Sequence, residues 1–426
     1  MSTKKGLRRW AVLAAAAGMI AGAATAHADV VADQAAAIII FPKIEVDARA
    51  NQAVNIDTII QVANTSNSPV RARCFYVRAN SFCASGPNVG QVCTIDADCA
   101  GSRCVANWQE KDFQLFLTKR QPLSWRASLG LTGQCPPTIA DPQECPEDAV
   151  PLSGGRVAQN QGGGPAQDNG ATIIQPVEDQ FVGELKCIEV NSADETPIDL
   201  NDLKGEATIV RTVTAVDGGV DVRKYNAIGI QSAGSPDPNP AILTLGGPGA
   251  EYNACPNVLV LDHFFDSNGG TVTTHANTVN GGVATNVVFV PCSEDFEHQN
   301  AHYGDATLQF LIYNEFEQRF STSTKVSCYR DTKLSDIDTR QGSADDVTSI
   351  FSAAVQGTLT GQTRIRPVPG TSKANKVLAI AEETWEAQNG VLNGFKTARN
   401  VQSYQPVNAT DPAQSDFIDI GPPLGF

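Results

Sequence analysis

Two stretches of the chain, Ile38–Tyr76 and Val287–Tyr329, present the same succession of apolar segments. In each stretch one segment ends at a proline, a second ends at an asparagine, and a third carries a cysteine before an aromatic residue. The corresponding landmarks are Pro42 and Pro291, Asn64 and Asn314, and Cys74 and Cys328. A further match, Leu-Asn-x-x-Lys, follows in each half at Leu200–Lys204 and Leu392–Lys396. This shared order predicts an internal duplication.

The apolar segments have the side-chain alternation of β-strands. Val70, Ala72 and Cys74 would share one face of a strand, while Arg71 and Arg73 would share the other. Gly and Pro are frequent, at 36 and 24 residues, as in turn-rich β proteins. No segment alternates strands with helices as α/β enzymes do. We therefore expect an all-β chain of two tandem β-sandwich domains, immunoglobulin-like or of another Greek-key type.

The 426 residues are too many for one ordinary domain and suit two. We expect the first sandwich over residues 29–234, a linker over 235–254 and the second sandwich over 255–404. The linker is placed there because residues 235–240 hold three prolines, which cannot enter the interior of a sheet. Residues 405–426 are polar and contain proline, so we expect a loose C-terminal tail.

The first 28 residues have the pattern of a secretory signal peptide. Basic residues at 4, 5, 8 and 9 precede an apolar run over 11–24, and Ala26-His27-Ala28 is a small-x-small cleavage site. No later apolar stretch is long enough to predict a transmembrane segment. We expect an exported protein that is periplasmic, extracellular or bound at the cell surface.

The charge balance limits the classes of partner. The chain has 46 acidic and 31 basic residues, which gives a net charge of −15. An acidic protein of this kind repels nucleic acid and anionic membranes, so neither is expected as a partner.

All 11 cysteines follow the predicted leader, and an oxidising compartment favours disulfides. Four of them lie within residues 83–104, a segment with almost no core-forming side chains, which predicts a small disulfide knot inserted in the first domain. Three pairings are possible, and we favour Cys83–Cys99 with Cys93–Cys104. A zinc site is the weaker alternative, because the segment lacks paired Cys-x-x-Cys motifs.

The other cysteines lie on or near the predicted strands and in one long loop. The loop, residues 131–180, is rich in Gly and Pro, and a disulfide between Cys135 and Cys145 would close its base. Cys74 is expected to pair with Cys187. Cys292 is expected to pair with either Cys255 or Cys328. Because the number of cysteines is odd, we expect at least one cysteine to be free or to pair with another chain.

His298 and His302 are spaced so that a helix would place both imidazoles on one face. This spacing is similar to the zincin motif, but Gln299 occupies the position of the general-base glutamate, so the usual activation of water is not expected. A Zn²⁺ or Cu²⁺ site formed by His298, His302 and His263 is one interpretation. A polar loop with solvent-facing histidines is the other, and it is the one we favour.

Acidic loops offer a second possible metal site, for Ca²⁺. None of them completes an EF-hand pattern, so solvated loops are the preferred interpretation. The candidates are Asp96 and Asp98, Asp266, Asp336 and Asp338, and Asp345 with Asp346.

No hydrolase nucleophile elbow and no phosphate-binding loop is present in the sequence. We therefore expect an exported non-enzymatic protein, structural or adhesive, whose knot and long loop contact a protein or glycan partner. The alternative is a secreted metal- or carbohydrate-binding protein with its site near His298 and His302. A secreted hydrolase is a third, less favoured class.

Overall fold

The computed structural model describes the chain as a set of strands with their connections. The described residues are 32–48, 54–93, 96–106, 108–131, 174, 176–191, 195–213, 219–234, 241–247, 249–267, 271–273, 278–280, 282–299, 304–338, 349–368, 376–386, 395–404 and 416–421. The predicted signal peptide, most of the predicted loop 131–180 with Cys135 and Cys145, and His302 lie outside these residues.

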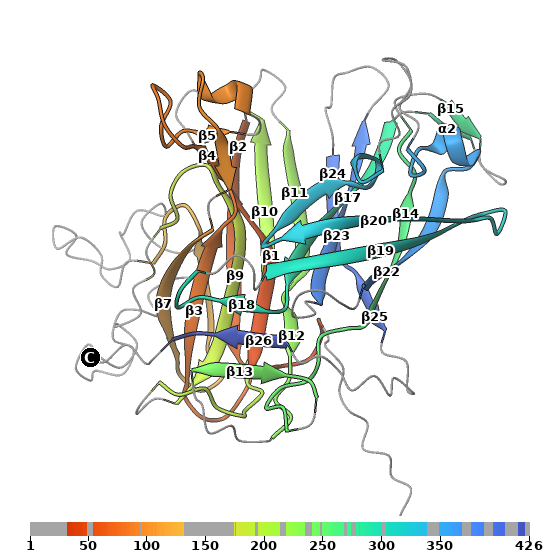
Figure 1. Cartoon of the computed structure of the whole chain (residues 1–426). Helices are drawn as coiled ribbons and strands as arrows, with labels where there is room; N and C mark the ends of the chain where they lie inside the picture. The colour runs from red at the N-terminus through yellow and green to blue at the C-terminus, as the bar shows by residue number, and fades with distance from the viewer. Residues whose placement is uncertain are drawn as a thin grey trace, which may run out of the picture.

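The chain is nearly all β, as predicted, and its sheets are mostly antiparallel (Figure 1). Within the described residues the helical pieces are short: η1 (Asp96–Cys99), η6 (Leu334–Asp336) and α2 (Ala353–Gln356). No helix in this part of the chain has the length and apolar character needed to cross a membrane.

The first half forms two sheets that share one core. Sheet 1 has the order β12 (Ile228–Ile230), β1 (Ile38–Val46), β9 (Phe181–Val190), β3 (Val70–Arg78) and β7 (Gln109–Leu117). Sheet 2 has the order β11 (Val220–Asn226), β10 (Leu203–Val213), β2 (Val54–Asn64) and β8 (Pro122–Arg126). Phe41 and Leu185 of sheet 1 pack with Trp125 and Ile209 of sheet 2. Alternation along each strand directs these side chains inward.

The second half forms two larger sheets and one small one. Sheet 3 has the order β20 (Arg319–Ser327), β19 (Asp305–Asn314), β22 (Thr360–Pro367), β14 (Val258–Phe264) and β25 (Gln402–Tyr404). Sheet 4 has the order β21 (Arg330–Lys333), β17 (Gly282–Pro291), β23 (Val377–Glu386) and β24 (Phe395–Asn400). Sheet 5 has the order β13 (Ile242–Leu245), β26 (Asp416–Asp419) and β18 (Glu294–Asp295). Phe289 of sheet 4 and Phe310 of sheet 3 meet in the second core.

Two smaller sheets are also present among the described residues. A hairpin joins β15 (Thr271–Thr273) and β16 (Thr278–Asn280). The disulfide insertion forms a sheet of β5 (Val92–Cys93), β4 (Ser81–Cys83) and β6 (Cys104–Ala106).

A third core joins the two halves. The face of sheet 1 that points away from sheet 2 carries Ile38 and Ile40, which pack with Leu243 of sheet 5 and with Val290 and Leu378 of sheet 4. Sheet 1 is therefore covered on both faces, and in Figure 1 sheet 5 crosses beside its lower end. The two halves thus share buried apolar side chains.

This shared core changes the predicted organisation at two places. Within the predicted linker 235–254, residues Ile242–Leu245 form β13, and Leu243 and Leu245 are completely buried. Within the predicted loose tail, Asp416–Asp419 form β26, which pairs with β13 and β18. Both short segments supply apolar residues to the face of sheet 1, a role that their prolines and polar neighbours conceal in the sequence.

The two halves do not have the same strand order. β1 pairs with β9, and the corresponding β17 pairs with β23. However, β10, which begins within the first Leu-Asn-x-x-Lys, pairs with β2, whereas β24, which begins within the second, pairs with β23. Cys74 lies within β3, while Cys328 lies at the corner between β20 and β21 with a φ of 61°. The landmark matches therefore do not mark equivalent strands throughout.

Disulfides Cys74–Cys187, Cys83–Cys99 and Cys93–Cys104 are present as predicted. Of the two partners considered for Cys292, the structure has Cys255. Cys74 and Cys187 lie opposite each other on neighbouring strands of one sheet, whereas the typical immunoglobulin bridge joins two sheets.

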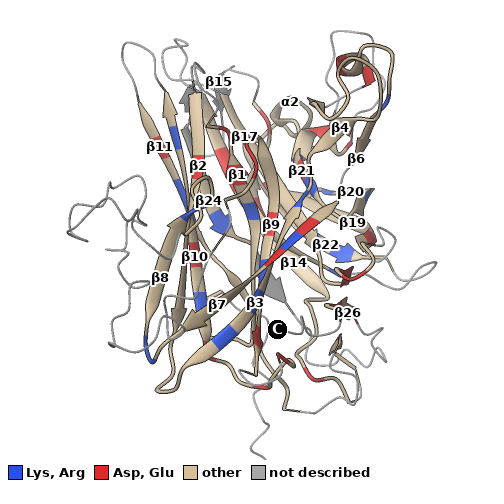
Figure 2. Cartoon of the chain, turned by 90° about the vertical axis from the view of Figure 1, so that its left-hand side faces the viewer, with Lys and Arg blue, Asp and Glu red and all other residues tan. Residues whose placement is uncertain are grey.

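Buried charges also connect the halves. Lys43 of β1 lies 2.7 Å from Asp331 of β21 and 2.8 Å from Glu382 of β23. Arg223 of β11 lies 2.6 Å from Glu382 and 3.2 Å from Glu45. Burial disfavours the charge of Lys43, but the carboxylates of Asp331, Glu382 and Glu45 outweigh it and raise the lysine's pKa. Figure 2 shows charged residues of both signs on the central strands.

We expect that Glu382→Gln lowers the free energy of unfolding by about 3 kcal/mol or more, because Lys43 and Arg223 would lose the carboxylate that they share inside the protein. Urea unfolding measures this change. Lys224→Ala is the matched control, since its pair with Glu206 is 55% exposed on the lysine side and should contribute less than about 1 kcal/mol. Equal losses in the two variants would contradict this account of the network.

Candidate functional site

The disulfide insertion extends from the end of the β3–β7 hairpin, at the upper left of Figure 1. Among its described residues, a buried cluster is formed by Cys83, Cys93 and Cys99, packed against Cys104. Val89 is 63% exposed at its surface. Because these cysteines are bonded in pairs, they are not available as zinc ligands. The insertion is a small projection whose shape depends on the disulfides Cys83–Cys99 and Cys93–Cys104.

A polar pocket of about 320 Å³ lies at the base of this insertion. The segment before β9, which ends the predicted long loop, supplies one wall, and the last residues of β3 with the first of β7 supply the other. Gln299, from the second half of the chain, completes the lining. The lining residues are Tyr76, Arg78, Gln109, Glu110, Lys111, Val177, Glu178, Phe181 and Gln299.

The charged groups of the pocket are held by contacts around it. Arg78 pairs with Glu178, and its guanidinium lies 4.3 Å from the ring centre of Phe82 in the insertion. Lys111 donates to the backbone oxygen of Pro176 at 2.9 Å. These contacts connect the pocket directly to the base of the insertion.

Glu110 is an acid of this pocket whose pKa is raised. Burial, together with the nearby Asp112, raises the pKa of Glu110 to about 7. One of its carboxyl oxygens is buried and finds no hydrogen-bond donor among the described residues. A ligand with a hydroxyl or N–H group could satisfy this oxygen.

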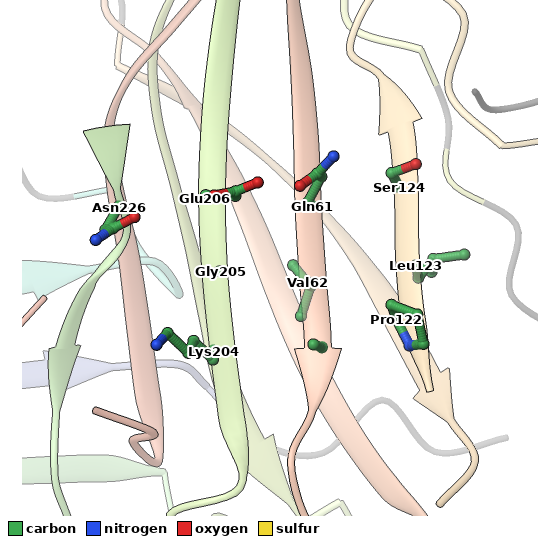
Figure 3. Close-up of a pocket in the computed structure, with 10 residues that line it drawn as sticks. Gln61, Val62, Pro122, Leu123, Ser124, Lys204, Gly205, Glu206 and Asn226 are labelled. Atoms are coloured by element: carbon green, nitrogen blue, oxygen red, sulfur yellow. The ribbon is translucent and has the colours of Figure 1, made fainter. Parts of the chain in front are cut away.

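Sheet 2 has an open depression of about 290 Å³ on its outer face (Figure 3). Lys204 and Glu206 flank Gly205 on β10, and Pro122 to Ser124 line the opposite side on β8. A side chain at position 205 would meet the ring of Phe41 at 2.5 Å, so core packing explains this glycine.

The predicted metal residues do not come together as one set. His263 is buried in β14, where its Nε2 lies 2.8 Å from the hydroxyl of Thr363 and its ring packs on Phe265 and Phe351. Burial lowers the pKa of His263 to about 4, and Arg399 acts in the same direction. His263 is thus a packed core residue with a polar partner.

His298 instead lies beside Asp295 and Asp419, and one potential ligand atom of each falls within 4.8 Å of the other two. Asp295 and Asp419 are register partners on the parallel strands β18 and β26. Two carboxylates directly opposite each other repel unless a cation lies between them. The sequence could not indicate Asp419, because it lies 121 positions after His298 and 124 after Asp295, and its strand was expected to be a loose tail.

Three of the acids considered for Ca²⁺ act as hydrogen-bond acceptors. Asp96 accepts from the N–H of Cys104 at 2.8 Å, and Asp266 accepts from the hydroxyl of Ser335 at 2.7 Å. Asp338 accepts from the N–H of Ile350 at 3.4 Å. Asp345 and Asp346 lie outside the described residues.

No protein-family model matches the chain, and no curated protein matches it in sequence. The function therefore has to be argued from the chemistry of these sites.

We expect acid to destabilise the protein through His263. Between about pH 6.5 and pH 4 the unfolded chain binds a proton at this position that the folded chain does not. Stability should therefore fall over this range as the pH decreases, by about 3 kcal/mol from this group. His263→Gln removes the titrating group, so unfolding free energies measured across the range should fall less steeply than in the wild type. Parallel curves for the two proteins would contradict the assignment.

Proposed function

We propose that this chain is an exported, non-enzymatic interaction protein whose contact surface is the disulfide insertion together with the polar pocket at its base. The signal-peptide pattern and the disulfides support export. The pocket carries the proposal, because it lies where the insertion and the end of the long loop meet. Loops on a rigid β scaffold are the usual position of binding sites.

The chemistry of the pocket favours a polar partner. Arg78 and Lys111 offer donors, Glu178 offers an acceptor, and Glu110 has a buried oxygen that lacks a donor among the described residues. With a pKa of about 7, Glu110 can either donate or accept a hydrogen bond near neutral pH. A glycan or the polar side of a peptide supplies matching hydroxyl, carbonyl and N–H groups. The sandwich-like scaffold would hold this surface in place.

Deletion of residues 84–103 should abolish binding while leaving the body folded. Cys83 and Cys104 are register partners on β4 and β6, so a short Gly-Ser turn can close the gap. The wild type, the deletion variant and Glu110→Ala are each applied to a glycan array and to immobilised cell-envelope proteins. We expect at least a tenfold loss of binding in both variants, since each removes part of the contact surface.

Lys204→Ala is the matched control for this experiment, because Lys204 lies at the depression of sheet 2. It should bind as the wild type does. Retention of full binding by the deletion variant and by Glu110→Ala would overturn the proposal, and loss in Lys204→Ala alone would move the site to sheet 2.

A second candidate function is metal binding at Asp295, His298 and Asp419. One observation favours it: two carboxylates from different parts of the chain converge with an imidazole. One nitrogen and two oxygen ligands suit Zn²⁺, whereas Ca²⁺ takes oxygen ligands only.

Titration of the purified protein with Zn²⁺ in a calorimeter tests this second candidate. We expect one ion per chain, with binding lost in His298→Ala and in Asp419→Asn because each removes a ligand. Asp262→Asn is the control, as Asp262 is an exposed acid that accepts from Gln362. If the wild type takes up no Zn²⁺, or if the ligand variants still bind it, metal binding at this site is excluded.

A further inference from the structure

A second buried ionic cluster lies between the halves, on the face of sheet 1 that packs against sheets 4 and 5. Glu184 and Lys186 are two residues apart on β9 and point to the same face, and Glu294 of β18 covers them. The side chains of Glu184 and Lys186 are 0% exposed and that of Glu294 is 1% exposed. The cluster is thus completely removed from water.

The three groups are in direct contact. Lys186 Nζ contacts Glu294 Oε2, lies 3.3 Å from Glu184 Oε1 and lies 3.0 Å from the backbone oxygen of Pro291. The second oxygens of Glu184 and of Glu294 are buried and find no hydrogen-bond donor among the described residues. One ammonium group therefore faces two carboxyl groups that it cannot fully satisfy.

Apolar and aromatic side chains enclose the cluster. Ile40 and Phe75 are the register partners of Lys186 on the two neighbouring strands. Phe75 stacks on Phe296 with ring centres 4.5 Å apart, and Lys186 Nζ lies 5.8 Å from the ring centre of Phe296. Burial raises the pKa of Glu294 well above its ordinary value, and the Glu184 carboxylate raises it further. The charged form of Glu294 is thus disfavoured at this position, although Lys186 acts in the opposite direction.

We propose that the amine of Lys186 and the carboxyl group of Glu294 condense into an intramolecular isopeptide bond. In this step a proton passes from the ammonium group to the carboxylate, which gives a neutral amine and a neutral acid. The Lys186 nitrogen then attacks Cδ of Glu294 and forms the C–N bond. One C–O bond of Glu294 breaks and one water molecule leaves, so the reaction needs no oxidant, reductant or further reactant.

Glu184 is placed to move the protons of this reaction. Its Oε1 lies 3.3 Å from the attacking nitrogen, so it can accept the proton that the nitrogen loses and return it to the departing oxygen. Contact between the reacting groups replaces an encounter in solution, which is the main advantage of an intramolecular reaction. The remaining amide N–H already has an acceptor, the backbone oxygen of Pro291 at 3.0 Å.

The first ionic cluster shows why the same reaction is not expected there. Glu382 faces two cations, Lys43 and Arg223, and both favour its charged form. The carboxylates Glu45 and Asp331 of that network are 19% and 23% exposed, so the network retains contact with water. A carboxylate held by two cations is a poor electrophile. Lys43 is therefore a control inside the same molecule.

Mass spectrometry of peptides from the reduced and alkylated mature protein tests the proposal. The expected product is one cross-linked pair of tryptic peptides that contains Lys186 and Glu294 and is lighter by one water molecule than the two peptides together. Trypsin should leave the Lys186–Cys187 bond intact, because the lysine is acylated. Fragmentation must place the link on these two residues.

Variants separate the roles in the reaction. Glu184→Gln should lower the cross-linked fraction at least tenfold, because it removes the group that shuttles protons. Lys43→Met should leave the cross-linked fraction unchanged. Glu382→Gln should also leave it unchanged when only the folded protein is analysed. Free Lys186 and Glu294 peptides from folded wild-type protein would overturn the proposal by themselves, so the result does not depend on a variant that folds. A link mapped to other residues would also overturn it.

Discussion

Burial of sheet 1 on both faces is the constraint on which the rest of the structure depends. β1 supplies Phe41 to the core shared with sheet 2 and Ile38 and Ile40 to the core shared with sheets 4 and 5. A strand in this position has no wet face for its polar residues. Lys43, Glu184 and Lys186 are therefore buried, and they have to find charged partners on the elements that cover them.

That requirement explains why the second half supplies acids at the contact. Asp331, Glu382 and Glu294 come from three different strands of sheets 4 and 5, and each meets a cation of the first half. These pairs add charge complementarity to the apolar packing of the third core. A buried charge at one of these positions would lower the stability of the protein if it lost its partner and stayed out of contact with water.

The sequence predicted well those features that local pattern determines. Alternation identified β3, and the short spacing among Cys83, Cys93, Cys99 and Cys104 left few ways to close the insertion. It predicted less well the features that depend on partners far along the chain. β13 and β26 are too short to show a period, and Asp419 meets His298 only because β26 pairs with β18. The sequence around His263 contains no motif that would show whether this residue binds a metal or packs in the core. Its burial in the structure shows that it belongs to the core.

The edge of sheet 2 has a further consequence. Asn226 of β11 and Asn400 of β24 exchange hydrogen bonds, the backbone N–H and oxygen of Asn226 meeting the side-chain amide of Asn400 at 3.1 and 2.7 Å. An unpaired strand edge is a template on which a second chain can add a strand. Here the side chain of Asn400, from the other half, bonds the last residue of β11, so the docking of the halves blocks strand addition at that end of the edge.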